Sequence, residues 1–213
     1  MDYWQDFEPE GYYHIYNKSG TGIKLFKDDN DHKVFLERFE RYLGGALNTY
    51  AYVLMSNHFH FLVKVKSINE LLSFAKTQKT NKSNDFMSTE IDPNEFIIDQ
   101  FKRFLSSYTI TYKNKYKHSG SVLMKRFKRI QSMSMEKNRY WLAYIHHNPI
   151  HHKYRKEYTE WTYCSYNAYL LTKETKTLKD EVLNQWFSSL EDFLQYHAAF
   201  KMDKQWDFDQ QPE

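Results

Sequence analysis

The stretch Tyr50-Ala-Tyr-Val-Leu-Met-Ser-Asn-His-Phe-His-Phe-Leu-Val-Lys-Val65 sets an H-x-H pair among β-branched, aromatic and large apolar residues. This composition predicts one or two strands. Successive side chains on a strand point to opposite faces, so His58 and His60 share one face while Phe59 and Phe61 take the other. Two imidazoles on one rigid strand can hold a divalent metal ion. An H-x-H pair also recurs by chance, so its surroundings have to decide.

The order of the predicted elements is typical of a ferredoxin-like fold. Strands are expected at residues 12–17, 47–54, 59–65 and 121–133, and the two long helices between them at 32–43 and 95–116. The order β-α-β-β-α-β predicts an α+β fold, in which helices cover one face of an antiparallel sheet. The H-x-H pair would then lie on a central strand.

Local signals set the expected limits of the remaining elements. Asp31 is expected to cap the first helix, and a short helix is expected at 69–77. Residues 80–93 are polar and predict a mobile loop. A helix over 136–147 is expected to end before Pro149, because a residue preceding proline is pushed out of the helical region. Residues 1–171 would form one domain, and 172–213 a helical extension packed on it, with an amphipathic helix over about 179–200.

Bulk composition predicts a folded protein of the cytoplasm. Of 213 residues, 41% are hydrophobic and 18% are aromatic, which is too much for a disordered chain. No apolar run approaches the roughly 20 residues of a membrane span, and the acidic N-terminus lacks the layout of a signal peptide. The single cysteine, Cys164, excludes an internal disulfide and fits a reducing compartment.

Charge is distributed unevenly along the chain. Residues 101–135 contain nine Lys or Arg and no Asp or Glu, and residues 1–171 carry +7 against −4 from residue 172 onward. With tyrosines interleaved, such a stretch can hold a phosphate backbone and stack on bases, although it can also be a solvated face. The residues expected to contact DNA are Tyr112, Lys113, Lys115, Lys117, Lys125, Arg126, Lys128 and Arg129.

The predicted helix before Pro149 brings a phenol close to an amide. Tyr144 and Asn148 are four residues apart, so they lie on one helical face about a turn from each other. An amide oxygen is an acceptable ligand for Mg²⁺ or Mn²⁺. The alternative is structural: Tyr144 would be a core aromatic and Asn148 the residue that ends the helix.

Several segments, in order, resemble the single-tyrosine HUH transposases, specifically the REP-associated tyrosine transposases. The segments are Tyr13-His-Ile-Tyr-Asn-Lys18, Met55-Ser-Asn-His-Phe-His-Phe-Leu-Val63, Tyr144-Ile-His-His-Asn-Pro-Ile150 and Trp161-Thr-Tyr-Cys-Ser-Tyr-Asn-Ala-Tyr169. The resemblance spans nearly the whole chain except the polar segment 80–93. One departure is Ser56, where the family often has proline; it does not touch the expected chemistry.

The resemblance implies a DNA-cleaving and rejoining enzyme that acts in transposition on single-stranded or hairpin DNA. It implies that His58, His60 and Asn148 bind Mg²⁺ or Mn²⁺ and that Tyr144 is the nucleophile, forming a 5′-phosphotyrosine intermediate. Some relatives complete the active site with a helix of a partner chain, so monomer and homodimer both remain open.

Other readings of these residues stay open at the level of sequence. Tyr140 is a rival nucleophile one turn before Tyr144, and the stripe of Tyr108, Tyr112 and Tyr116 fits core packing or base stacking. The rival metal ligands are His146, His147, His151 and His152. A different class of function is a non-catalytic single-stranded nucleic-acid-binding module of the same fold, which would need no metal. A relaxase or replication initiator would share the HUH strand but usually needs a longer chain.

Overall fold

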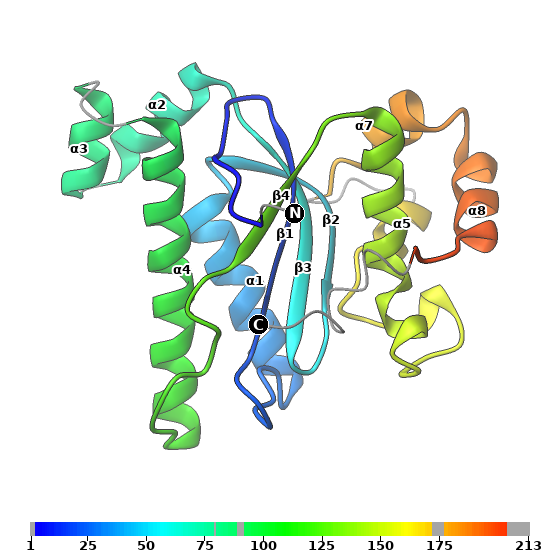
Figure 1. Cartoon of the computed structure of the whole chain (residues 1–213), viewed down its shortest axis with the longest axis horizontal. Coiled ribbons are helices and arrows are strands. Elements are labelled where there is room, and N and C mark those ends of the chain that lie inside the picture. The colour runs from blue at the N-terminus through cyan, green and yellow to red at the C-terminus, as the bar shows by residue number, and fades with distance from the viewer. Residues whose placement is uncertain (1–2, 79, 89–91, 172–176, 204–213) are drawn as a thin grey trace.

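A four-stranded antiparallel sheet forms the middle layer of the computed structural model, which describes residues 3–78, 80–88, 92–171 and 177–203 (Figure 1). The strands are β1 (Tyr12–Lys18), β2 (Leu47–Leu54), β3 (His58–Val65) and β4 (Lys128–Ser132), in the order β2-β3-β1-β4. This is the ferredoxin-like arrangement, with β1 and β3 in the centre. The predicted α+β fold class and the central position of the H-x-H strand are confirmed. β4 is shorter than the strand expected over 121–133.

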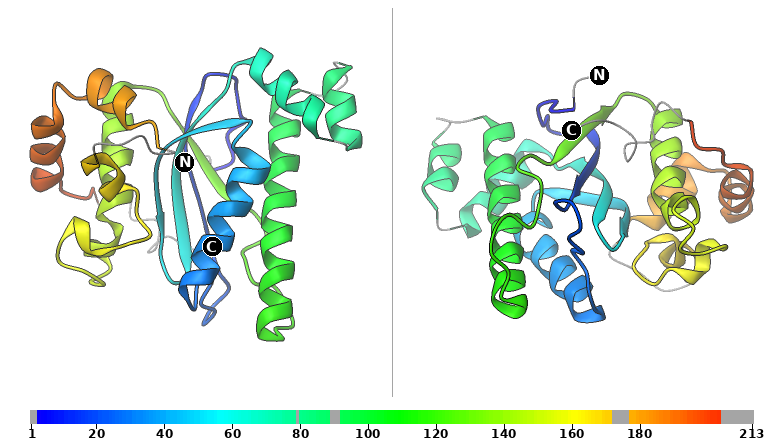
Figure 2. Two further views of the ribbon diagram at one scale, coloured as in Figure 1. Left: turned by 180° about the vertical axis from the view of Figure 1, so that it is seen from behind. Right: turned by 60° about the horizontal axis from the view of Figure 1, so that its bottom comes forward.

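Two long helices cover one face of the sheet, α1 (Asp29–Leu43) and α4 (Pro93–Tyr116) (Figures 1 and 2). Their contact with the sheet is made by aromatic rings: Phe39 stacks on Phe61 with 4.1 Å between ring centroids, and Phe104 lies edge-on to Phe39. The phenylalanines that flank the two histidines of β3 therefore point into this core. Burying such rings gives each about 1.5–3 kcal/mol relative to exposure, which fixes the strand with its histidines on the other face.

The opposite face of the sheet is covered by α5 (Met135–His151) and the C-terminal helices, so the molecule has three layers (Figure 1). Trp141 and Ile145 of α5 pack with Leu62 of β3 in a second core cluster. The remaining elements are α2 (Ile68–Thr77), α3 (Asn81–Met87), η1 (Tyr158–Glu160), α6 (Tyr166–Leu170), α7 (Lys179–Glu181), the π-helical turn η2 (Val182–Trp186) and α8 (Leu190–Ala199). None of the helices within the described ranges is long and apolar enough to cross a membrane.

Strand register decides which side chains share the α5 face. Tyr16 of β1 lies opposite His60 on one side and opposite Lys128 on the other, so these three form one row across the sheet. His14 lies two residues before Tyr16 and therefore points to the same face. Arg129 follows Lys128 and points to the other face, toward α4.

Two local expectations near the α1–α4 layer are wrong. The cap of α1 is Asp28, whose side chain accepts from the Asp31 N–H, while the Asp31 side chain completes a capping box at the third helical position. The segment 80–93 was expected to be a loop, but it contains α3, capped by Thr80. Phe86 anchors this helix by stacking on Phe96 at 4.7 Å. One buried ring and one cap are enough to form this short helix, although the segment is otherwise polar. Residues 89–91 lie outside the described residues.

Two helix limits in the C-terminal half also differ from expectation. α5 runs through Pro149 to His151, because a proline this near the end removes only one hydrogen bond of the helix. The helix expected over 179–200 is interrupted: Phe187 leaves helical geometry after η2, and Ser189 caps a new helix, α8. Of the expected extension 172–213, the structure describes residues 177–203, and Trp186 stacks on Tyr50 of β2 at 4.8 Å.

Candidate active site

The α5 face of the sheet brings two imidazoles of β3 to an amide of α5. His58 and His60 have their ring centroids 5.2 Å apart. The Nε2 atom of His58 lies 3.3 Å from the Oδ1 atom of Asn148, across 90 residues of sequence. All three side chains are buried. The fold therefore places His58 beside both of the other expected metal ligands, His60 and Asn148.

Hydrogen bonds on the outer side of each ligand aim its lone pair inward. Nδ1 of His58 lies 2.8 Å from the carbonyl oxygen of the Asn57 side chain, so in a neutral ring Nδ1 donates and Nε2 keeps a lone pair. Nδ2 of Asn148 donates to the backbone carbonyl of Tyr144 at 2.9 Å, which turns Oδ1 toward His58. Two acceptor atoms then face each other. A shared cation would explain this arrangement.

His60 has its second ring nitrogen held by a residue that the sequence analysis did not select. Its Nδ1 lies 2.9 Å from Nε2 of His14, on the neighbouring strand β1. Its own Nε2 is buried and has no hydrogen-bond partner among the described residues. Burial lowers the pKa of His60 well below its ordinary value, and the nearby His14, His58 and His152 lower it further. The ring therefore stays neutral, which is the form that binds metal.

The donor set fits a hard divalent ion. Imidazole nitrogen together with amide oxygen suits Mn²⁺ or Mg²⁺, with open positions left for substrate oxygens. Among the residues that the structure describes, no group of three or more His, Cys, Asp or Glu is arranged to hold a metal. A site here therefore depends on Asn148 as the third protein ligand.

Tyr144 lies beside the histidines. Its ring centroid is 5.6 Å from that of His60 and 5.5 Å from that of His14. The side chain is only 1% exposed. Asn148, one turn further along α5, is bonded to the backbone of Tyr144, so the expected nucleophile and the expected third ligand occupy one helical turn.

The hydroxyls of three rival tyrosines, Tyr108, Tyr112 and Tyr140, make backbone hydrogen bonds away from the histidines. Tyr140 is one turn away, with its ring 6.3 Å from that of Tyr144, and its hydroxyl accepts from the backbone N–H of Asp203. The stripe on α4 faces the other side of the sheet: the hydroxyls of Tyr108 and Tyr112 donate to backbone carbonyls at residues 25 and 24. These two buried rings pack in the α1–α4 layer, as the core alternative proposed.

Two of the rival histidines, His146 and His147, are bonded to side chains outside the site, whereas His152 lies near His58. His146 bonds His197 and Ser165 in a buried network on the far side of α5. His147 bonds the Tyr158 hydroxyl at 3.0 Å. His152 has its ring 4.9 Å from that of His58, and the ring of His151 lies 4.9 Å from that of His152.

A small cavity of about 180 Å³ opens at the two histidines of β3. It is lined by Trp4, Tyr16, Asn17, Lys18, His58, His60, Met124, Lys125, Arg126 and Lys128. Three of the residues expected to contact DNA, Lys125, Arg126 and Lys128, thus reach the same cavity as the histidines. Tyr144 does not line it.

The other residues expected to contact DNA lie apart from the histidines. Lys115 bonds the carboxylates of Asp28 and Asp31, which ties α4 to α1. Arg129 points to the α4 face, where its Nε donates to the Gln5 carbonyl. Tyr112 is buried, Lys117 adopts a left-handed conformation at the end of α4, and Lys113 lines a second cavity.

Comparison with known proteins shows which solved structure has a similar fold. A search of solved structures finds similarity to a REP-associated tyrosine transposase bound to a REP hairpin, with a TM-score of 0.57 and 11% sequence identity. The match covers 80% of this chain and 85% of that chain. No protein-family model and no curated protein matches the sequence. The chain therefore shares the fold of this tyrosine transposase, and the fold relationship expected from the sequence is confirmed.

His14 and Asn57 are the functional candidates that sequence reasoning missed. His14 stands two residues before Tyr16 on the strand that pairs with β3, so its parity alone would have put it on the histidine face. Asn57 directly precedes His58, and its role depends on a turn geometry that no periodicity reports.

Proposed function

We propose that the chain is a metal-dependent enzyme that cleaves and rejoins DNA through a phosphotyrosine intermediate, in the manner of a tyrosine transposase. The observation that carries the proposal is the meeting of His58 Nε2 and Asn148 Oδ1, 3.3 Å apart, on the turn that also bears Tyr144. The fold supports it, because the similar solved structure is a tyrosine transposase bound to a DNA hairpin.

In this proposal His58, His60 and Asn148 hold Mg²⁺ or Mn²⁺. A dication there would lower the pKa of a phenol that approaches it and withdraw charge from the scissile phosphate. The Tyr144 oxygen attacks phosphorus, so that a Tyr–O–P bond forms while the P–O3′ bond breaks. The phenol loses its proton and the departing 3′ oxygen gains one. The resulting 5′-phosphotyrosine keeps the energy of the ester, so the 3′-hydroxyl of another strand can reverse the step and complete strand transfer.

Residues of β1, β4 and the segment before β4 would position the substrate. Lys125, Arg126 and Lys128 surround the small cavity at the histidines, where they can pair with phosphate oxygens. A phosphate at this cavity approaches His58 and His60 on the α5 face of the sheet, beside Tyr16 and Lys128. Because Tyr144 is covered, its attack requires α5 to shift when DNA binds.

A covalent adduct tests the proposal. The purified chain is incubated with Mn²⁺ and hairpin oligonucleotides copied from the DNA that flanks its gene, and adducts are resolved on a denaturing gel. The wild-type chain should form a stable protein–DNA adduct, and Tyr144→Phe should form none while still binding the DNA. Tyr140→Phe is the matched control and should retain the adduct. An adduct on Tyr144→Phe would contradict the assignment of the nucleophile.

One observation favours a second function, a non-catalytic module that binds single-stranded nucleic acid. The phenol of Tyr144 is 1% exposed, as expected of a core aromatic. Such a module would bind oligonucleotides equally well with and without Mn²⁺ and would form no adduct. In that case, replacing His58 or Asn148 would leave nucleic-acid binding unchanged.

A further inference from the structure

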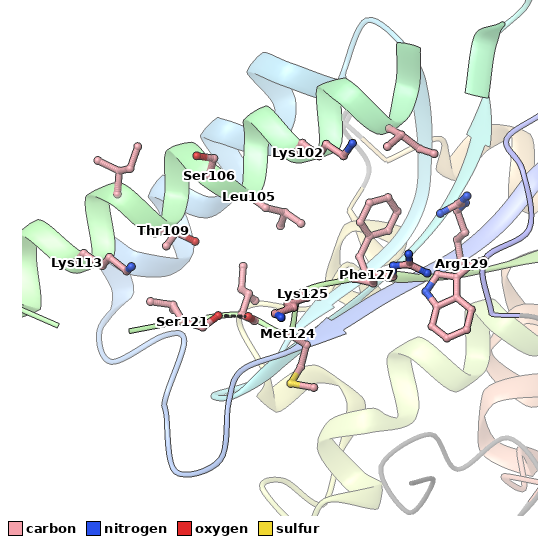
Figure 3. Close-up of a pocket in the computed structure, with 16 residues that line it drawn as sticks. Lys102, Leu105, Ser106, Thr109, Lys113, Ser121, Met124, Lys125, Phe127 and Arg129 are labelled. Atoms are coloured by element: carbon pink, nitrogen blue, oxygen red, sulfur yellow. Dashed lines mark hydrogen bonds between the residues drawn. The ribbon is translucent and has the colours of Figure 1, made fainter. Parts of the chain in front are cut away.

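A second, larger cavity of about 670 Å³ lies between α4 and the segment leading into β4 (Figure 3). One helical stripe of α4 forms its first wall: Lys102, Leu105, Ser106, Thr109, Ile110 and Lys113. Their spacing places all six on the same side of the helix. Residues 121–127 form the second wall, from which Lys125 and Phe127 also line the cavity.

The charge of this groove is of one sign. Among the residues that the structure describes, no Asp or Glu lines it, whereas Arg129 and four other cations do: Lys102, Lys113, Lys125 and Arg126. Among the described residues, none of these four cations forms an ion pair with a carboxylate. Of the cations in the acid-free stretch, Lys115 and Arg129 are paired with acidic side chains, and Arg129 also lines the groove; Lys102, Lys113, Lys125 and Arg126 are not so paired among the described residues.

Between its cations the groove offers apolar and hydroxyl groups. Leu105, Leu123 and Phe127 line it, and Ile110, which also lines it, is 57% exposed. Ser106 and Thr109 add hydroxyls along the same stripe. Unpaired bases can pack on such apolar surface while their phosphates meet the lysines. A duplex keeps its bases inside and would leave this surface uncovered.

The groove is continuous with the active-site cavity. Trp4, Met124, Lys125 and Arg126 line both. The indole of Trp4 is 43% exposed, and the Arg126 guanidinium lies over it at 5.8 Å from the ring centroid. An exposed aromatic ring beside a cation is a stacking platform for a nucleobase. It stands where a strand would pass from one cavity to the other.

We infer that this groove binds the unpaired DNA strand that adjoins the scissile phosphate, with the phosphates on Lys102, Lys113 and Lys125 and a base on Trp4. The inference rests on the proposed function for its substrate. It names a surface that the metal ligands and Tyr144 do not touch, so the two can fail separately.

Salt-dependent binding of a labelled oligothymidylate tests the groove. Removing two phosphate contacts should reduce the slope of log affinity against log salt by about 1.4, since each contact with a single strand contributes about 0.7. The test variant is Lys102→Gln/Lys113→Gln, and the matched control is Lys33→Gln/Lys76→Gln, which removes the same charge from α1 and α2. Equal slopes for wild type and the groove variant would overturn the inference. A slope reduced equally in the control would do so too.

Lysine footprinting gives a readout on the wild-type chain and needs no variant. Bound oligothymidylate should protect Lys102, Lys113 and Lys125 from amine acylation, measured by peptide mass spectrometry, and leave Lys33 and Lys76 reactive. Equal protection by a fully paired duplex would overturn the assignment to an unpaired strand. An absent adduct with intact protection would refute only the proposed cleavage, whereas adduct formation without protection would refute only the groove.

Discussion

The Nε2 atom of His14 lies 2.9 Å from Nδ1 of His60, so that the two central strands of the sheet join their imidazoles edge to edge. Burial, and secondarily the charge of Lys137, lower the pKa of His14 to about 3. A neutral His14 can donate or accept at Nε2. If it donates to Nδ1 of His60, then His60 carries its own proton on Nε2, and that nitrogen has no lone pair for a metal. For metal binding the pair must instead have His60 donate from Nδ1, with Nε2 of His14 as acceptor.

His14→Gln should therefore weaken Mn²⁺ binding without removing a ligand. A residue that bonds the outer ring nitrogen of a metal-binding histidine is typically worth 10–100-fold in metal affinity. We expect the Mn²⁺ affinity to fall by a factor in that range, measured by calorimetry on the purified chain. His118→Gln, at the end of α4, is the control and should bind as wild type. An unchanged affinity of His14→Gln would show that His14 does not orient the ligand.

Asn148 and His152 should respond differently to the same substitution. Asn148→Ala should abolish the Mn²⁺-dependent rise in melting temperature, because it removes the amide oxygen that faces His58. Asn148→Asp should keep the rise, since it retains an oxygen at that position. His152→Ala should also keep it, because the described histidines alone do not form a ligand set. A rise that survives in Asn148→Ala but not in His152→Ala would transfer the third-ligand role to His152.

Acid should destabilise the chain through the buried pair His146–His197. Nδ1 of His197 donates to the Phe193 carbonyl, and its Nε2 lies 2.9 Å from Nδ1 of His146. Burial lowers the pKa of His197 to about 4 and that of His146 well below its ordinary value. The unfolded chain, with ordinary pKa values near 6.5, binds protons first as pH falls. The free energy of unfolding should then drop between pH 6.5 and 4 by about 1.4 kcal/mol per pH unit for each such histidine.

The variant His197→Gln isolates that contribution. It removes one titrating group, so its unfolding free energy should fall less steeply with acidification than that of wild type, by about 1.4 kcal/mol per pH unit. Above pH 6.5 the two curves should run parallel. Chemical denaturation across this pH range measures both, and identical acid slopes would mean that His197 titrates normally in the folded chain.

Trp4 should contribute to DNA binding through its ring and not through its size alone. Stacking of one base on an aromatic side chain is worth about 1–3 kcal/mol. Trp4→Ala should weaken oligothymidylate binding by an amount in that range, whereas Trp4→Phe should recover most of the loss. Fluorescence anisotropy measures both, with circular dichroism to verify the fold. Equal losses in the two variants would argue against stacking.

Strand periodicity carried most of what the sequence could predict. Alternation around the H-x-H pair assigns His58 and His60 to one face and the phenylalanines to the core, and the structure has them there. The helical spacing of Tyr144 and Asn148 likewise depends only on local geometry. Such patterns survive folding because one buried face fixes the register of the whole element.

Long-range contacts decided what the sequence could not show. α3 forms because Phe86 stacks on Phe96 of α4. α5 continues past Pro149 because the helix has nearly ended there and Pro149 is buried. Eight residues of the acid-free stretch were expected to contact DNA, but one of them, Lys115, bonds Asp28 and Asp31, more than eighty positions away in sequence. The sequence of a basic stretch shows which residues are charged, but not which of them will pair with acidic residues in the fold.

The hydrogen bond from the Asn148 side chain to the Tyr144 carbonyl couples the position of the amide to the backbone of α5 at Tyr144. A shift of α5 that uncovers the phenol carries the amide oxygen along with it, because the amide is bonded to the backbone of Tyr144. The coordination sphere and the reacting oxygen would thus engage and disengage together. Under the proposed function, the protein without DNA would keep the Tyr144 hydroxyl covered, and the shift of α5 that permits the reaction would be needed before any DNA is nicked.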